Sequence, residues 1–178
     1  MDYQFFKFFN SLAGKKEWLD ILLIMLGNYL IMFIPIIIFL VYFFSKRRKK
    51  IYPLLLQTLI AFGLIYFFVY LIGLLVARPR PFISHQDVYQ LDKFFSKSTD
   101  FSFPSHHAAV AFIFAWIVLF DWRRFGIIIF ILACLTGLGR VFIGVHYPTD
   151  IVAGALISLL AALLIKKFLL KYIKHGNT

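Results

Sequence analysis

Five stretches of this chain contain no charged residue, and they constrain the possible folds more than any other feature of the sequence. They cover residues 21–45, 51–77, 101–120, 125–139 and 151–165. A helix needs about 20 apolar residues to cross a bilayer core of roughly 30 Å. The first three stretches are long enough, and the last two become so when the flanking residues 141–145 and 147–150 are included. The sequence therefore predicts an all-α fold with five membrane-spanning helices.

The composition excludes a soluble enzyme and a nucleic-acid-binding module. Of the 178 residues, 62% are hydrophobic and 15% are charged, whereas a soluble domain carries about 25% charged residues. The net charge of +11 does not indicate a nucleic-acid partner, because too little polar surface remains for a soluble module. The single cysteine, Cys134, lies in an apolar stretch, so neither a disulfide framework nor a cysteine metal site is expected. We predict one membrane-embedded domain over residues 1–178.

The basic residues indicate how the helices are oriented. They are concentrated after the first, third and fifth stretches, at residues 46–50, 123–124 and 166–174. Cytoplasmic loops of membrane proteins are enriched in Lys and Arg. We therefore expect these segments and the C-terminus in the cytoplasm, and the N-terminus outside.

The start of the chain has the spacing of an amphipathic helix. Phe5, Phe8, Phe9 and Leu12 follow the pattern i, i+3, i+4, i+7, which places them on one helix face. We expect an interfacial helix on the outer leaflet. A short helix that packs onto the bundle as a cap is the alternative that the pattern leaves open.

Three polar clusters lie at those ends of the apolar stretches that are expected outside. Arg78-Pro79-Arg80-Pro81 ends the second stretch, and Phe103-Pro104-Ser105-His106-His107 lies at the start of the third. The last cluster runs from Gly139-Arg140 through His146 to Asp150. Ionisable residues in membrane helices are costly and usually face the bundle interior or a water-filled cavity. Their convergence on one membrane face predicts a functional site.

These residue types suit the binding of a phosphate group. Proline is common in the first turn of a helix, so Pro104 places Ser105 and the two following histidines at a helix start. Free backbone N–H groups at such a start bind anions, and the Ser105 hydroxyl adds a donor. The guanidinium groups of Arg80 and Arg140 have the forked geometry that matches phosphate oxygens.

The histidines and the last aspartate suit nucleophilic chemistry. Asp150 follows a predicted helix start and could reach back to His146. A carboxylate on one ring nitrogen sets the tautomer and leaves the other nitrogen free to attack, while His107 could donate a proton. The sequence has no cluster of Asp and Glu that could hold a metal ion, so we expect no metal site and no cofactor. Three acidic residues scattered along one loop are interpreted as solvated: Asp87, Asp92 and Asp100.

The same residues resemble the three-part signature of the type-2 phosphatidic-acid phosphatase superfamily. The signature reads K-x6-R-P, P-S-x-H and S-R-x5-H-x3-D. Arg80-Pro81 matches the end of its first part, residues 104–107 match the second, and residues 140–150 match the third after its serine. The resemblance covers about residues 70–155.

This resemblance implies a membrane lipid phosphatase with a covalent intermediate. His146 would form a phosphohistidine, Asp150 would orient it, and His107 would protonate the leaving group. The phosphoryl oxygens would be bound by the remaining signature residues, Arg80, Ser105 and Arg140.

The chain departs from the signature at three positions. The family lysine would fall at Gly73, the serine of the third part is Gly139, and the usual glycine of the second part is His106. His106 either contacts the substrate or merely fills the helix start. Another cation could take the place of the missing lysine, and the candidates are Arg78, Lys93 and Lys97.

Within the superfamily the chain is similar to the bacitracin-resistance-type undecaprenyl-diphosphatases, because it is compact and has a residue other than glycine at position 106. This similarity implies hydrolysis of a polyprenyl diphosphate lipid at the outer face of a bacterial cell membrane. A phosphatase for phospholipid monoesters, such as phosphatidic acid or phosphatidylglycerol phosphate, is an alternative in the same fold. A small anion channel or transporter is an alternative of another class, with Arg78, Arg80 and Arg140 as its selectivity ring. The oligomeric state is left open.

Overall fold

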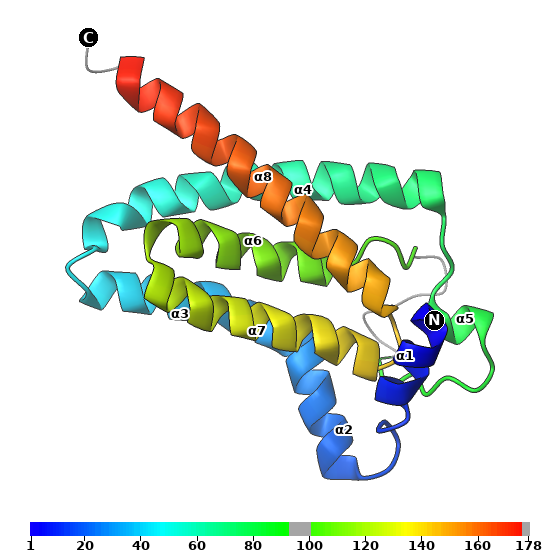
Figure 1. The fold of residues 1–178 in the computed structure, drawn as a ribbon. Coiled ribbons are helices and arrows are strands. Elements are labelled where there is room, and N and C mark those ends of the chain that lie inside the picture. Colours follow the sequence, from blue (N-terminus) through cyan, green and yellow to red (C-terminus); the bar gives the residue numbers. More distant parts are fainter. Residues whose placement is uncertain (93–100, 176–178) are drawn as a thin grey trace.

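In the computed structural model, residues 1–92 and 101–175 are described, and every regular element among them is helical (Figure 1). The helices and short helical segments, in chain order, are α1 (Asp2–Asn10), α2 (Glu17–Ile24), η1 (Met25–Tyr29), α3 (Leu30–Phe44), η2 (Arg48–Lys50), α4 (Ile51–Val76), α5 (Pro81–Ser84), α6 (His106–Asp121), α7 (Arg123–Phe142) and α8 (Pro148–His175).

The long helices form a membrane bundle, as the sequence predicts. Four continuous helical segments are long and apolar enough to cross a bilayer: α2 with η1 and α3, α4, α7, and α8. The third expected span, α6, has 16 residues and is about 24 Å long at 1.5 Å per residue. It is shorter than expected because residues 101–105 do not continue the helix. The protein is therefore a multi-pass membrane protein with one short central helix.

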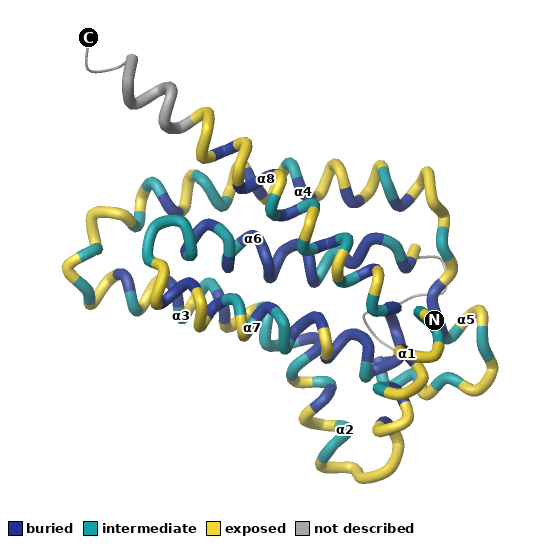
Figure 2. The backbone as a smooth tube through the Cα atoms, in the orientation of Figure 1, coloured by how far each residue is buried: buried dark blue, intermediate teal, exposed yellow. Residues whose placement is uncertain are grey.

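Helix α6 lies at the centre of the bundle, packed against α4, α7 and α8 (Figure 1). Figure 2 shows it mostly buried, while α3 and α4 expose much of their surface. Small side chains let neighbouring helices approach closely in membrane bundles, and Ala108, Ala109 and Ala111 are fully buried here. On α8, a Cβ atom at Gly154 would lie 2.7 Å from the Ser105 carbonyl oxygen. This close contact holds the start of α6 beside the start of α8.

A π-helical segment, η1, interrupts the first spanning helix. There the backbone of Gly27 touches the backbone of Gly139 on α7, since a Cβ at Gly139 would lie 2.5 Å from the Gly27 nitrogen. The contact leaves no room for the serine that the family signature has at position 139. It also directs the next residue, Asn28, into the protein interior, where it is buried.

Helix α1 packs onto the bundle with one face. Phe6 and Asn10 are buried, and the Asn10 amide nitrogen donates to the carbonyl oxygens of Tyr89 and Phe142, both at 2.9 Å. Phe8, on another face of the helix, is exposed. The helix thus caps the bundle, as in the alternative that the sequence left open, while Phe5, Phe8 and Leu12 of its predicted apolar face stay exposed.

Candidate active site

The three polar clusters meet at one end of the bundle. Figure 1 shows the end of α4 and the starts of α6 and α8 at the same end as α1. A cavity of about 360 Å³ opens there. It is lined by Tyr66, Val69, Tyr70, Gly73, Arg80, Phe101, Phe103, Pro104, His106, His107, Arg140 and His146. Two arginines and three histidines therefore share one cavity.

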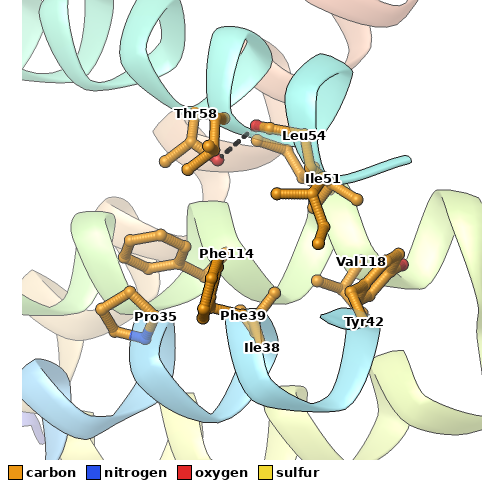
Figure 3. A pocket seen from close by; sticks show the side chains of 11 residues that line it. Pro35, Ile38, Phe39, Tyr42, Ile51, Leu54, Thr58, Phe114 and Val118 are labelled. Carbon is orange, nitrogen blue, oxygen red and sulfur yellow. Dashed lines mark hydrogen bonds between the residues drawn. The ribbon is translucent and has the colours of Figure 1, made fainter. Parts of the chain in front are cut away.

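A second pocket, near the opposite end, lacks the groups for such chemistry. It lies between α3, α4 and α6 and is almost entirely apolar (Figure 3). Its two hydroxyl groups are already engaged, because Thr58 donates to the Leu54 carbonyl at 2.8 Å and Tyr42 donates to Asp121 at 2.9 Å. The polar cavity is thus the candidate active site.

The geometry around His146 sets its tautomer. The ring nitrogen Nδ1 lies 2.8 Å from the Ser102 carbonyl oxygen. A carbonyl oxygen only accepts hydrogen bonds, so Nδ1 carries the proton and Nε2 holds the lone pair. Burial lowers the pKa of His146 to about 4; Arg80 and Arg140 act in the same direction, and Asp150 acts against them. The ring is therefore neutral at pH 7, as a nucleophile requires.

Asp150 acts on His146 through Ser102 in this structure, rather than directly as the sequence suggested. The distance from His146 Nδ1 to Asp150 Oδ2 is 3.6 Å, which is too long for a hydrogen bond. Instead, Asp150 Oδ2 accepts from the Ser102 hydroxyl at 2.5 Å and from the Tyr147 backbone N–H at 2.8 Å. The Asp150 carboxylate thereby positions Ser102, and the Ser102 carbonyl positions the His146 ring.

Arg140 is held by two residues that the sequence did not single out. Its guanidinium donates to the Asn28 side-chain oxygen and to Asp92 Oδ2, the latter at 3.2 Å. Arg140 and Asp92 are both about 1% exposed as side chains. The interpretation of Asp92 as a solvated loop residue is therefore wrong. A buried guanidinium needs a counter-charge, because an unpaired buried charge is very costly, and Asp92 provides it.

The start of α6 forms one wall of the cavity. Ser105 is the N-cap of the helix, and its hydroxyl oxygen accepts the Ala108 N–H at 3.4 Å. Ser105 is fully buried and does not line the cavity, so its role as a direct phosphate ligand stays a prediction. His106 and His107 do line the cavity, and the His106 ring meets the edge of the Tyr66 ring at 5.3 Å between centroids.

Arg78 is not positioned to replace the missing family lysine. Gly73 lines the cavity, but Arg78 does not; its guanidinium binds Asp150 and Asp2 instead. The expectation that Arg78 contacts the phosphate is thus not supported by its position. The other two candidates, Lys93 and Lys97, lie outside the described residues.

Among the described residues, the sequence pointed to neither Asn28 nor Ser102 as part of the site, and it misassigned Asp92 to the solvated loop. Only Asn28 had a usable signal, since it is a polar side chain in an uncharged stretch and polar residues inside membrane helices are commonly functional. Nothing local distinguishes Asp92 from Asp87, which forms an exposed ion pair with Lys7. The contribution of Ser102 comes partly from its backbone carbonyl, which no side-chain pattern reveals.

Comparison with known proteins shows what this chain is similar to. The sequence profile of the PAP2 superfamily matches residues 54–174, more than half of the chain. Undecaprenyl-diphosphatase BcrC of Bacillus subtilis (strain 168) is 29% identical over 168 residues, which cover 94% of this chain and 84% of that protein.

Two crystal structures share the fold. Aquifex aeolicus LpxE superposes with a TM-score of 0.70 at 29% identity, covering 93% of this chain and 94% of that chain. The PAP2-type phosphatidylglycerolphosphate phosphatase of Bacillus subtilis superposes with a TM-score of 0.63 at 24% identity, covering 95% of this chain and 86% of that chain. The second likeness supports the fold alone.

Proposed function

The chain belongs to the PAP2 superfamily, and from that premise we propose that it hydrolyses undecaprenyl diphosphate to undecaprenyl phosphate and inorganic phosphate. One observation carries the proposal from the structural side. A buried, neutral His146 with its Nδ1 held by Ser102 shares a cavity with Arg80 and Arg140. Phosphoryl transfer through a histidine needs these two things, a nucleophile and cations that bind the phosphate oxygens. The name of the Bacillus subtilis relative supports the choice of lipid.

The proposed reaction has two steps. In the first, Nε2 of His146 attacks the terminal phosphorus, a P–N bond forms, and the P–O bond to the lipid phosphate breaks. Arg80 and Arg140 stabilise the charge on the transferring oxygens, and His107 gives a proton to the departing oxygen. In the second step, water attacks the phosphohistidine and gives a proton back to His107, the P–N bond breaks, and inorganic phosphate leaves with His146 restored.

Two of the groups that act on the phosphate, Arg140 and His146, are held in position before substrate binds. Asp92 and Asn28 hold Arg140, while Ser102 holds the His146 ring. Preorganised charges stabilise a transition state without reorganisation during the reaction. The channel alternative leaves this arrangement around His146 without a purpose.

The test of this function compares substrates. Purified protein in detergent, with a chelator present, is expected to release inorganic phosphate from undecaprenyl diphosphate faster than from phosphatidic acid or phosphatidylglycerol phosphate. Malachite-green detection of phosphate measures all three in the same format. Faster release from either phospholipid would contradict the proposed substrate, and a strict requirement for a divalent metal would contradict a reaction carried by Arg80 and Arg140.

We further propose that the active site faces the outside of a bacterial cell membrane. The support is the distribution of basic residues, since Lys46–Lys50 and Arg123–Arg124 lie at turns opposite the candidate site. Loops enriched in Lys and Arg stay in the cytoplasm. The N-terminus would then lie outside and the C-terminus inside.

Cysteine labelling tests this orientation in intact cells. In a Cys134→Ala background, a cysteine at Gln86, which is exposed near the site, is expected to react with a membrane-impermeant thiol reagent. A cysteine at Ser45, at the opposite end, is expected to react only after the cells are opened. The reverse pattern would place the active site in the cytoplasm.

A further inference from the structure

Arg78 lies behind the cavity, not in it, and its contacts are with protein groups. Its Nη1 donates to Asp150 Oδ1 and to the Thr149 hydroxyl, both at 2.8 Å. Its Nη2 donates to Asp2 Oδ2 at 2.7 Å. The plane of the guanidinium is further fixed by the Tyr147 ring, whose centroid lies 3.7 Å from Cζ. Arg78 thus joins a carboxylate of the site to a carboxylate of the N-terminal helix.

Asp2 completes this arrangement from α1. Its carboxylate accepts the Arg78 guanidinium, the Thr149 hydroxyl at 2.5 Å, and the Thr149 backbone N–H at 3.2 Å. The side chains of Asp2 and Arg78 are only 23% and 27% exposed, so solvent screens their interaction less than that of a surface pair. One face of α1 is therefore tied to the first turn of α8, where Asp150 lies.

A continuous series of hydrogen bonds leads from Asp2 to the nucleophile. Arg78 holds Oδ1 of Asp150, and this leaves Oδ2 for the hydroxyl of Ser102 at 2.5 Å. The carbonyl of Ser102 in turn holds Nδ1 of His146 at 2.8 Å. Without Arg78, the Asp150 carboxylate would be held at Oδ2 alone, by the Ser102 hydroxyl and the Tyr147 backbone N–H, and its hold on Ser102 would be less rigid.

We propose that Asp2 and Arg78 form a positioning pair for His146, acting through Asp150 and Ser102, so that helix α1 is a working part of the active site. The proposal rests on the proposed function, in which His146 attacks phosphorus. It assigns Arg78 a different role from the phosphate contact that its place in the sequence suggested. Neither residue touches the substrate; each acts on the angle and position of the attacking ring.

The expected effect is on kcat rather than on KM. Small misplacements of a reacting group can cost up to about 10²-fold in rate. We expect Asp2→Asn to lower kcat roughly tenfold, and Arg78→Lys to lower it further, because a lysine ammonium cannot span two carboxylates as a planar fork does. KM and the inhibition constant of inorganic phosphate should change less than about twofold, since neither residue lines the cavity. Asp2→Glu, which keeps the charge, should recover part of the loss.

A second tether of α1 provides the matched control. Lys7 and Asp87 form an ion pair between the same helix and the loop that follows α5, with both side chains at least half exposed. Asp87→Asn removes this tether without touching Asp150, and it is expected to leave kcat unchanged. Thermal unfolding in detergent should show that Asp2→Asn and Asp87→Asn are equally folded.

The outcomes separate the proposal from its rivals. Equal losses of kcat in Asp2→Asn and Asp87→Asn would mean that α1 is only a structural cap, and the positioning pair would be refuted. A rise in KM and in the phosphate inhibition constant for Arg78→Lys, with kcat unchanged, would restore the phosphate contact and also refute it. All variants are compared on whichever lipid the wild-type protein hydrolyses, so an incorrect choice of substrate does not affect this test.

Discussion

Replacement of His146 by alanine is expected to abolish turnover and the covalent intermediate together. The imidazole is the proposed nucleophile: it lines the cavity, and the Ser102 carbonyl holds its ring in position. Removing a nucleophile of this kind lowers kcat by several orders of magnitude. We expect a loss of at least about 10⁴-fold, which corresponds to roughly 5 kcal/mol of transition-state stabilisation.

The intermediate can be measured directly. Turnover of substrate labelled in its terminal phosphate, stopped with base and denaturant, should leave acid-labile and base-stable phosphate on the wild-type protein and none on His146→Ala. His85→Ala is the matched control, because His85 lies at the same end of the bundle but stacks on Tyr3 rather than lining the cavity. A labelled His146→Ala protein, or one with full activity, would end the covalent mechanism.

Replacement of His107 by alanine is expected to have an effect that depends on the leaving group. In a phosphatidyl monoester the departing oxygen belongs to an alcohol, and an alkoxide needs a proton as the P–O bond breaks. In a diphosphate the departing group is a phosphate, which leaves with less help. General-acid assistance is worth about 10²–10⁴-fold, and its value falls as the leaving group improves.

We therefore expect His107→Ala to lower kcat/KM by roughly 10³-fold for a monoester and by about tenfold for a prenyl diphosphate. A series of aryl phosphates with graded leaving-group acidity gives the same test in soluble form: the dependence of rate on leaving-group pKa should be steeper in the variant. His106→Ala is the neighbouring control, since His106 also lines the cavity and should not steepen that dependence. Equal losses on all substrates would show that His107 positions phosphate instead.

The membrane fold and the family could be predicted from the sequence. Uncharged stretches of 15 to 27 residues indicate membrane-spanning helices directly, because a charged side chain near the centre of the bilayer is costly. The spacing from Arg140 to His146 to Asp150 is equally local: it spans the end of α7, one turn and the start of α8. Such features can be recognised from the order of the residues alone, without knowing which segments pack against them.

The hydrogen-bond and ion-pair partners of the charged groups could not be predicted from the sequence. Asn28 and Arg140 are 112 positions apart, and only the contact between η1 and α7 brings them together. By sequence, Asp92 and Asp87 are alike; by structure, one is the buried counter-charge of Arg140 and the other an exposed partner of Lys7. The direction of Arg78 was likewise undecided, because a guanidinium in a loop can turn toward the cavity or toward Asp150.

By itself, then, the sequence predicted a bundle of membrane helices, which residues carry the family signature, and that these residues gather at one end. Only the tertiary structure decided that Ser102 stands between Asp150 and His146, that Asn28 and Asp92 hold Arg140, and that α1 is docked on the site through Asp2. The physical reason is how far apart along the chain the interacting residues lie. Hydrophobic stretches and motif spacing are properties of neighbouring residues, whereas the choice of a hydrogen-bond or ion-pair partner depends on which distant segments the packed bundle brings within about 3 Å.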